Sequence, residues 1–97
     1  MDNLTEIGEK AHQALEARTQ ARDRALVQAR QLTRHAAHAI RAIHRSEVSL
    51  AQENLAQALA LVKTLKSDLE NYPDLFFAGY TQDAIKEYAE TQTNKAA

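Results

Sequence analysis

The stretch RDRALVQARQLTRHAAHAIRAIHR, residues 22–45, decides the fold, because it lacks glycine and proline and repeats its apolar residues every three or four positions. That period is typical of an amphipathic α-helix. The pattern continues toward the N-terminus, so the predicted apolar stripe consists of Leu4, Ile7, Ala11, Ala14, Ala21, Ala25, Leu32, Ala36, Ala39 and Ile43. We therefore predict a first helix over about residues 4–45, which is about 60 Å long at about 1.5 Å per residue.

Ser46 and Glu47 are predicted to break the chain between this helix and a second one over about residues 48–71. The apolar residues of the second segment again share one helical face. They are Val48, Ala51, Leu55, Ala58, Leu59, Val62, Leu65, Leu69 and Tyr72. Pro73 is predicted to end the second helix, because proline has no amide donor and restricts the conformation of the residue before it.

A short connection containing both phenylalanines of the chain leads to a third helix. Phe76 and Phe77 are predicted to plug the core between helix ends, next to a glycine turn. Thr81 is predicted to cap the N-terminus of a short helix over about residues 81–91. Asp83 would then lie in its first turn, where a negative charge interacts favourably with the helix dipole.

Together these elements predict an all-α chain with one domain, residues 1–97, built from about three long antiparallel helices of which the third is short. Composition agrees, because the chain has nineteen alanines but only two glycines and one proline. A first helix of about 60 Å cannot bury its whole apolar face within a chain this small. We therefore expect oligomerisation, as a homo-oligomer, to complete the helical bundle.

Several classes of protein are excluded by composition and patterning. The chain has no cysteine, which excludes disulfides and thiolate metal sites and favours a reducing compartment. The first ten residues, MDNLTEIGEK, have neither the basic region nor the apolar region of a signal peptide. The longest apolar run, ALALV at 58–62, is far shorter than the roughly 20 residues that a membrane span needs. We expect a cytoplasmic protein without a membrane partner.

Charge is distributed unevenly along the chain. Residues 1–46 carry eight Lys and Arg against five Asp and Glu, a net of +3, whereas residues 47–97 carry four against eight, a net of −4. No acid occurs between Arg24 and Arg45. Five basic residues of this segment, here called the arginine stripe, recur every three or four positions: Arg30, Arg34, His38, Arg41 and Arg45. Because they share one helical face, they can contact successive phosphates of a nucleic acid.

A plainer interpretation of the arginine stripe is structural. The stripe would then be a solvated face, or it would form salt bridges with the acidic residues of the second half. The candidate partners are Glu47, Glu53, Asp68 and Glu70. The spacing of the basic residues is compatible with both interpretations.

Carboxylates gather in the segment GYTQDAIKEYAE, residues 79–90. Asp83, Glu87 and Glu90 are spaced i, i+4 and i+7, which puts them on one helical face over two turns. Oxygen ligands of this kind suit Mg²⁺ or Mn²⁺, and such ions can activate water and stabilise charge on a phosphodiester. The plainer interpretation is a solvated helix end with a pair between Lys86 and Glu90.

The order of these segments resembles the translin family, in particular the archaeal and bacterial translin-like proteins. The resemblance lies in residues 22–45, in YPDLFFAGY (72–80) and in TQDAIKEYAE (81–90), and it covers essentially the whole chain. It implies an all-α subunit that assembles laterally into a hollow, ring-like or shell-like oligomer. It also implies binding of single-stranded RNA or DNA.

The acidic pair points, through the same resemblance, to a nuclease branch. That branch, similar to translin-associated factor X, cleaves single-stranded RNA with Mg²⁺ held by an E-x-x-E pair and an aspartate from a later helix. The E-Y-A-E of this chain matches the pair, so the resemblance assigns catalysis and Mg²⁺ binding to Glu87 and Glu90, with Asp83 as a further candidate ligand. Family members are about twice this long, and the later aspartate has no counterpart here.

The sequence therefore predicts a translin-like protein that binds single-stranded RNA and derives from an Mg²⁺-dependent endoribonuclease lineage. Its metal site is expected to be incomplete within one subunit. The alternative is a structural helical module that self-assembles and has no nucleic-acid function. The alanine-rich first helix and the absent third ligand favour this alternative.

Overall fold

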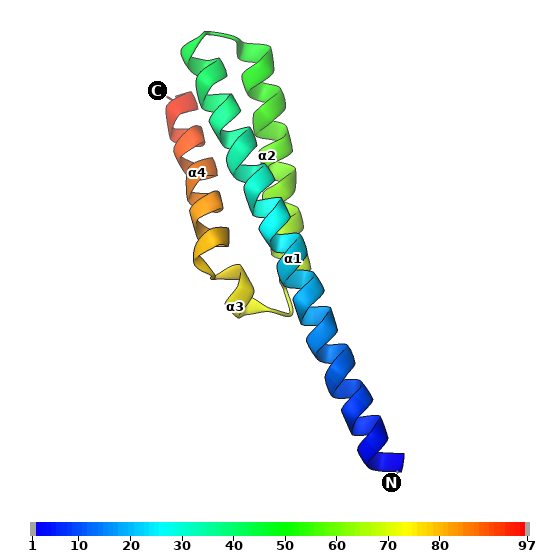
Figure 1. The fold of residues 1–97 in the computed structure, drawn as a ribbon. Helices are drawn as coiled ribbons and strands as arrows, with labels where there is room; N and C mark the ends of the chain where they lie inside the picture. Colours follow the sequence, from blue (N-terminus) through cyan, green and yellow to red (C-terminus); the bar gives the residue numbers. More distant parts are fainter. Residues whose placement is uncertain (1, 97) are drawn as a thin grey trace.

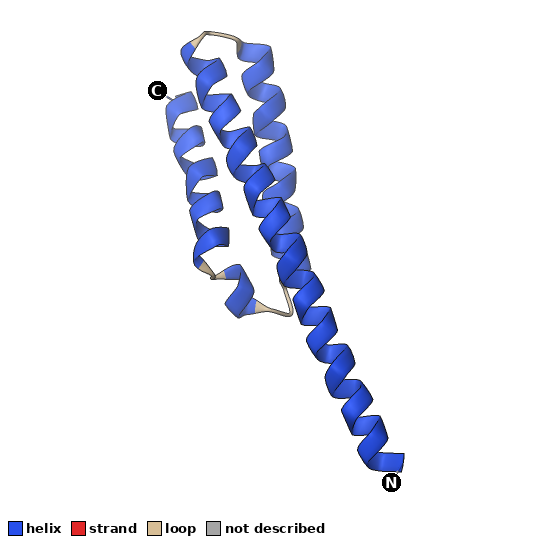
Figure 2. Ribbon diagram, viewed as in Figure 1, coloured by secondary structure: helices blue, strands red, loops and turns tan. Residues whose placement is uncertain are grey.

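The computed structural model describes residues 2–96, with side chains from Asn3 to Thr93. This part of the chain forms four helices and no strand, which confirms the all-α prediction (Figures 1 and 2). The helices are α1 (Asp2–His44), α2 (Val48–Asp68), α3 (Pro73–Phe76) and α4 (Gly79–Ala96). The first two therefore lie close to the predicted segments 4–45 and 48–71, whereas α4 begins earlier and ends later than the predicted 81–91.

The molecule is an elongated bundle, with principal extents of 67 × 18 × 15 Å. Figure 1 shows α2 running back along α1 and α4 running in the same direction as α1 on its other side. The N-terminal part of α1 extends beyond the other helices, and every residue from Asn3 to Ala17 is exposed. We call residues 3–17 the N-terminal arm.

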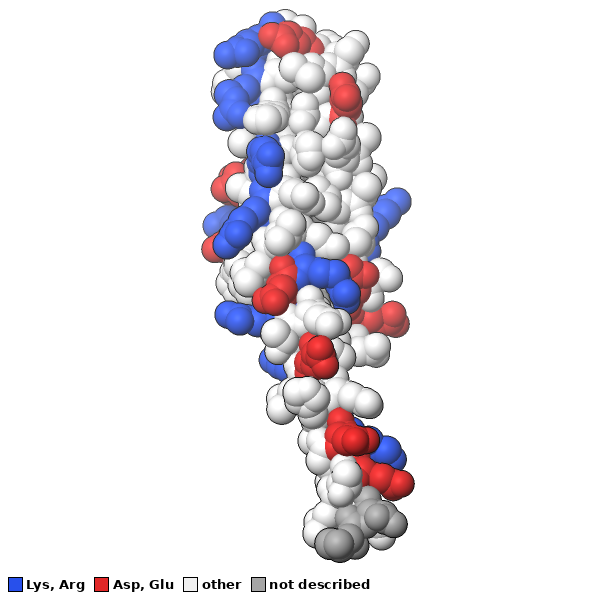
Figure 3. Space-filling view, turned by 45° about the vertical axis from the view of Figure 1, so that its right-hand side comes forward, with Lys and Arg blue, Asp and Glu red and all other residues white. Residues whose placement is uncertain are grey.

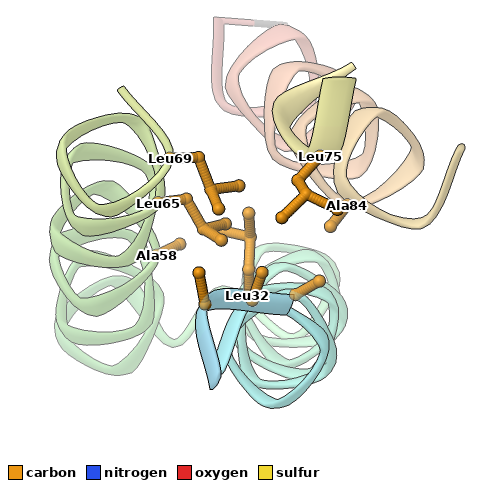
Figure 4. Close-up of a cluster of buried hydrophobic side chains, with 9 residues drawn as sticks. Leu32, Ala58, Leu65, Leu69, Leu75 and Ala84 are labelled. Carbon is orange, nitrogen blue, oxygen red and sulfur yellow. The ribbon is translucent and has the colours of Figure 1, made fainter. Parts of the chain in front are cut away.

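A small apolar core lies where α1, α2 and α4 meet (Figure 4). Leu32 of α1 and Leu65 of α2 are both 0% exposed, and Leu75 and Ala84 close the core from the α3–α4 side. The buried positions of α1 are otherwise alanines: Ala21, Ala25, Ala29, Ala36, Ala39 and Ala42. Small side chains let neighbouring helices approach closely, so the core gains contact density although each alanine buries little area.

The turn between α1 and α2 depends on Ser46, which adopts a left-handed conformation with φ of 60°. The amide of Glu47 donates to the carbonyl of Ala42 at 2.8 Å, and that of Ser46 donates to Ile43 at 3.0 Å. These two bonds form a Schellman motif, which satisfies the last carbonyls of α1. The predicted break at Ser46 and Glu47 is therefore where the helix ends, and its physical basis is this cap.

The connection from α2 to α4 differs from the prediction at three residues. Pro73 does not end α2, which stops at Asp68, but begins α3, where the missing amide of a first-turn proline costs no hydrogen bond. Thr81 is not an N-cap, because α4 begins at Gly79 and the buried Thr81 hydroxyl donates to Leu75 O at 3.2 Å. Phe77 is not a core plug, because it is 69% exposed, whereas Phe76 is partly buried against the core.

Buried polar side chains fix how the helices align. Thr91 of α4 is 0% exposed, and its hydroxyl lies 2.9 Å from Glu87 O and 3.4 Å from Ala36 O of α1. Asn54 of α2 is 8% exposed, and its Oδ1 lies 3.0 Å from Nδ1 of His35 on α1. Because a buried polar group that loses its partner is costly, these contacts favour one alignment of α2 and α4 along α1.

The pair Arg18–Asp74 joins the start of the covered part of α1 to α3. Arg18 Nη1 donates to Asp74 Oδ1 at 3.2 Å, and Nη2 donates to Oδ2. The hydrogen bond from Arg18, with its positive charge, lowers the pKa of Asp74 below its ordinary value of 3.8. The Arg18 side chain is partly exposed and that of Asp74 is largely exposed, so water screens the pair and limits its contribution.

We expect Asp74→Asn to lower the melting temperature slightly at neutral pH and not at all in strong acid. The folded protein holds Asp74 at a lowered pKa, so the stabilisation is complete above the unfolded pKa and disappears as the pH falls through the folded value. Circular dichroism melting of both proteins across the acid range tests this. A difference in melting temperature that does not change with pH would contradict it.

Candidate nucleic-acid interface

The arginine stripe lies on the outward face of α1. Its five side chains are all exposed, whereas the core positions Ala29, Leu32 and Ala36 of the same helix segment are buried. Since successive residues of an α-helix are separated by about 100°, the stripe lies on the side of α1 that faces away from α2 and α4. Figure 3 shows Lys and Arg side chains in a column along one side of the upper part of the molecule.

No residue of the stripe is engaged in an ion pair with any side chain that the structure describes. The ion pairs of the described side chains are His12–Glu16, at 3.9 Å, and Arg18–Asp74. Of the acids proposed as structural partners, Asp68 accepts a hydrogen bond from Gln28 at 3.2 Å, and Glu47, Glu53 and Glu70 form no ion pair with a described side chain. Within the described part of the chain, the positive charge of the stripe is therefore not neutralised by direct pairing.

Two shallow hollows flank the stripe, and sequence spacing did not indicate them. One, of about 390 Å³, lies beside Arg30 and is lined by Leu26, Ala29, Thr33 and Tyr80. The other, of about 360 Å³, lies beside Arg34 between α1 and α2 and is lined by Gln31, His35, Gln57, Ala60 and Leu61. They bring an aromatic ring and two amide side chains next to the basic row. Both hollows form because α4 and α2 pack on α1.

The carboxylates of α4 do not converge on one point. Asp83 and Glu90 are exposed and Glu87 is partly buried, and no group of three His, Asp or Glu side chains able to hold a metal occurs in the described part of the chain. The predicted Lys86–Glu90 pair is also not formed among the described side chains, since neither residue takes part in an ion pair there. These residues alone therefore do not fit Mg²⁺, and we derive no catalytic step from them.

In comparisons with known proteins, no family model matches the chain, and no curated protein or solved structure matches it. The resemblance to the translin family therefore depends on the sequence segments quoted above and stays a prediction. For the described residues, no helix combines the length and the hydropathy needed to cross a membrane. What the fold and the site define is a small all-α bundle that displays a straight row of basic residues.

Proposed function

We propose that this protein binds single-stranded nucleic acid, RNA in the first place, along the outward face of α1. The observation that carries the proposal is the arginine stripe, whose five basic side chains are exposed and not engaged in ion pairs with described side chains. Steps of three or four residues separate its members by about 4.5–6 Å along the helix axis. That spacing lets neighbouring guanidinium groups reach neighbouring phosphates of an extended strand.

Binding would draw its free energy mainly from counterion release. Each phosphate neutralised by an arginine releases condensed cations, so affinity falls as salt rises. His38 adds a hydrogen-bond donor, and Tyr80, in the hollow beside Arg30, offers an aromatic surface of the kind on which bases stack. A single strand, rather than a duplex, is proposed as the ligand on the predicted resemblance of residues 22–45 and 72–90 to the translin family.

Fluorescence anisotropy with a labelled single-stranded RNA, titrated at several salt concentrations, tests the proposal. We expect binding at low salt and a linear loss of log affinity with log salt concentration. A duplex of the same sequence and a single-stranded DNA are the comparison ligands. Absence of binding at low salt, or an affinity independent of salt, would contradict the proposal.

We expect Mg²⁺ to support no cleavage of the bound RNA by this chain. Glu87 and Glu90 supply two carboxylates, and no third His, Asp or Glu side chain of the described residues joins them in a metal-holding group. Incubation of labelled RNA with Mg²⁺ or Mn²⁺, followed by gel analysis, checks this. Metal-dependent cleavage that is abolished in Glu87→Gln and Glu90→Gln, but retained in Glu70→Gln, would establish the nuclease activity that the resemblance implies.

We also propose that a second copy of the chain completes the bundle. The observation that favours self-association is the N-terminal arm, where Leu4, Ile7 and Leu15 are 76%, 63% and 67% exposed. Three large apolar side chains on one face of a helix are a common mark of a protein interface. The arm and the arginine stripe occupy different parts of α1, so self-association and nucleic-acid binding are compatible.

A further inference from the structure

The apolar face of the N-terminal arm is a direct continuation of the face of α1 that forms the core. Leu4, Ile7, Ala11 and Ala14 follow one another at steps of three and four, and the series continues through Arg18 to the buried Ala21 and Ala25. Because α1 is a single helix from Asp2 to His44, both parts of this face point the same way. The face of α1 that α2 and α4 cover in the core is therefore the same face that the arm leaves exposed.

The bundle, in turn, has an uncovered side. α2 and α4 both pack extensively on α1 but hardly touch each other, so among the described helices the side of the bundle between α2 and α4 is open. On α2, Asn54 marks the side that faces α1, while Leu59, 40% exposed, and Val62 lie further round the helix. On α4, Ile85 and Tyr88 are only partly buried against the core. We call the side formed by Leu59, Val62, Ile85 and Tyr88 the α2–α4 face.

We propose that two copies of this chain form an antiparallel dimer in which each N-terminal arm packs on the α2–α4 face of the other copy. This inference rests on the self-association proposed above and names its contact. The apolar face of the arm points to the same side of α1 as the core of its own bundle. A second, antiparallel copy placed on that side of the arm therefore turns its α2–α4 face toward the arm. Because the two copies are related by a twofold axis, each arm packs on the other copy in the same way. Each three-helix bundle thereby becomes a four-helix bundle.

The lengths of the two surfaces agree with this arrangement. An arm of fifteen residues is about 22 Å long, and α4 is about 27 Å long with its 18 residues. The two bundles then meet at their α3 ends, where the connection to α4 carries Phe77, which is 69% exposed. The dimer thus covers the exposed aromatic residue as well as the arm.

The arm is acidic, whereas lysines border the α2–α4 face. The arm carries Glu6, Glu9 and Glu16 but one lysine, Lys10, and Figure 3 shows acidic side chains along the narrow lower part of the molecule. The exposed Lys63 and Lys66 lie on α2, and Lys66 follows Leu59 and Val62 at helical spacing, which puts it at the edge of the α2–α4 face. At about 100° per residue, Glu6, Glu9 and Glu16 lie on the side of the arm away from its apolar face, so they form no contact across the proposed interface. The net negative charge of the arm disfavours the pairing of two arms and favours a partner surface bordered by lysines.

Crosslinking tests the contact directly, because the chain has no cysteine of its own. Two differently tagged copies, one with Leu4→Cys and one with Leu59→Cys, are co-expressed and treated with a short flexible bismaleimide. We expect a crosslinked heterodimer. The matched control replaces Leu59→Cys with Gln57→Cys, an exposed position on the opposite side of α2, beside Arg34, and should give none. Efficient crosslinking of Leu4→Cys with itself would show that arms pair with each other and would overturn the proposal.

Light scattering separates this contact from self-association as such. We expect the wild-type chain to have twice the monomer mass. The double variant Ile7→Asp, Leu15→Asp should have the monomer mass. The control Gln13→Asp, on the other side of the arm, should stay dimeric. A monomeric wild type overturns self-association altogether. If the double variant stays dimeric, the exchange of arms is overturned but self-association is not. The same holds if the wild type is dimeric but the Leu4→Cys and Leu59→Cys copies do not crosslink. Circular dichroism of each variant confirms that it is folded.

Discussion

Replacing Leu32 by alanine is expected to destabilise the protein by about 3 kcal/mol, within the range measured for buried leucines. Leu32 is 0% exposed and belongs to the core cluster that also contains Leu65, Leu69 and Ala84 (Figure 4). Most other core positions of α1 are alanines, which cannot expand to fill the cavity. For a domain of this size, such a loss lowers the melting temperature by roughly 15 °C.

Thermal and urea unfolding at one fixed protein concentration measure this loss, since self-association would make both concentration-dependent. Val27→Ala is the matched control, because Val27 lies on the same helix but is 51% exposed. Its effect should stay within about 0.5 kcal/mol. Equal losses for both variants would show that the core does not lie where α1, α2 and α4 meet.

Replacing three residues of the arginine stripe is expected to weaken RNA binding about 100-fold at ~0.1 M salt. In the variant Arg30→Gln, Arg34→Gln and Arg41→Gln, each substitution removes one phosphate contact. The slope of log affinity against log salt concentration should become shallower by about 2, because each contact with a single strand contributes about 0.7. Stability should hardly change, since the three side chains are exposed and form no ion pairs with described side chains.

A second triple variant serves as the control for net charge. Arg22→Gln, Arg24→Gln and Lys86→Gln removes the same formal charge at exposed positions outside the stripe. We expect it to retain most of the affinity and most of the salt slope. If both triple variants lose affinity equally, the protein binds RNA through its overall charge, and the outward face of α1 is not the specific site.

Sequence periodicity was sufficient for the long helices and for the face that each one buries. The apolar stripe of residues 4–45 is one helix, and its central members Ala25, Leu32, Ala36 and Ala39 are buried as expected. This succeeds because a 3.6-residue period is a local property that packing preserves. The outward position of the arginine stripe followed from the same period, since it lies opposite the apolar stripe.

The connection after α2 could not be derived in this way. Pro73 and Thr81 are compatible with a stop and a cap by their chemistry, yet the structure places one at a helix start and the other inside α4. The competing interactions come from distant residues: Leu75 is buried in the core, and Asp74 binds Arg18, fifty-six positions away. Local propensity carries no information on such contacts. The burial of Phe76 and exposure of Phe77 depend on the same docking.

The sequence by itself determined an all-α chain, the long first helix, and a basic row opposite its apolar stripe, because helical period and charge are properties of neighbouring residues. The tertiary structure decided which part of that stripe is covered. It buries residues 21–42 at core positions, leaves the N-terminal arm exposed and leaves the α2–α4 face only partly buried, since α2 and α4 reach only part of the length of α1. It also decided that Asp83, Glu87 and Glu90 are joined by no further described ligand, because ligand convergence depends on how separate helices pack.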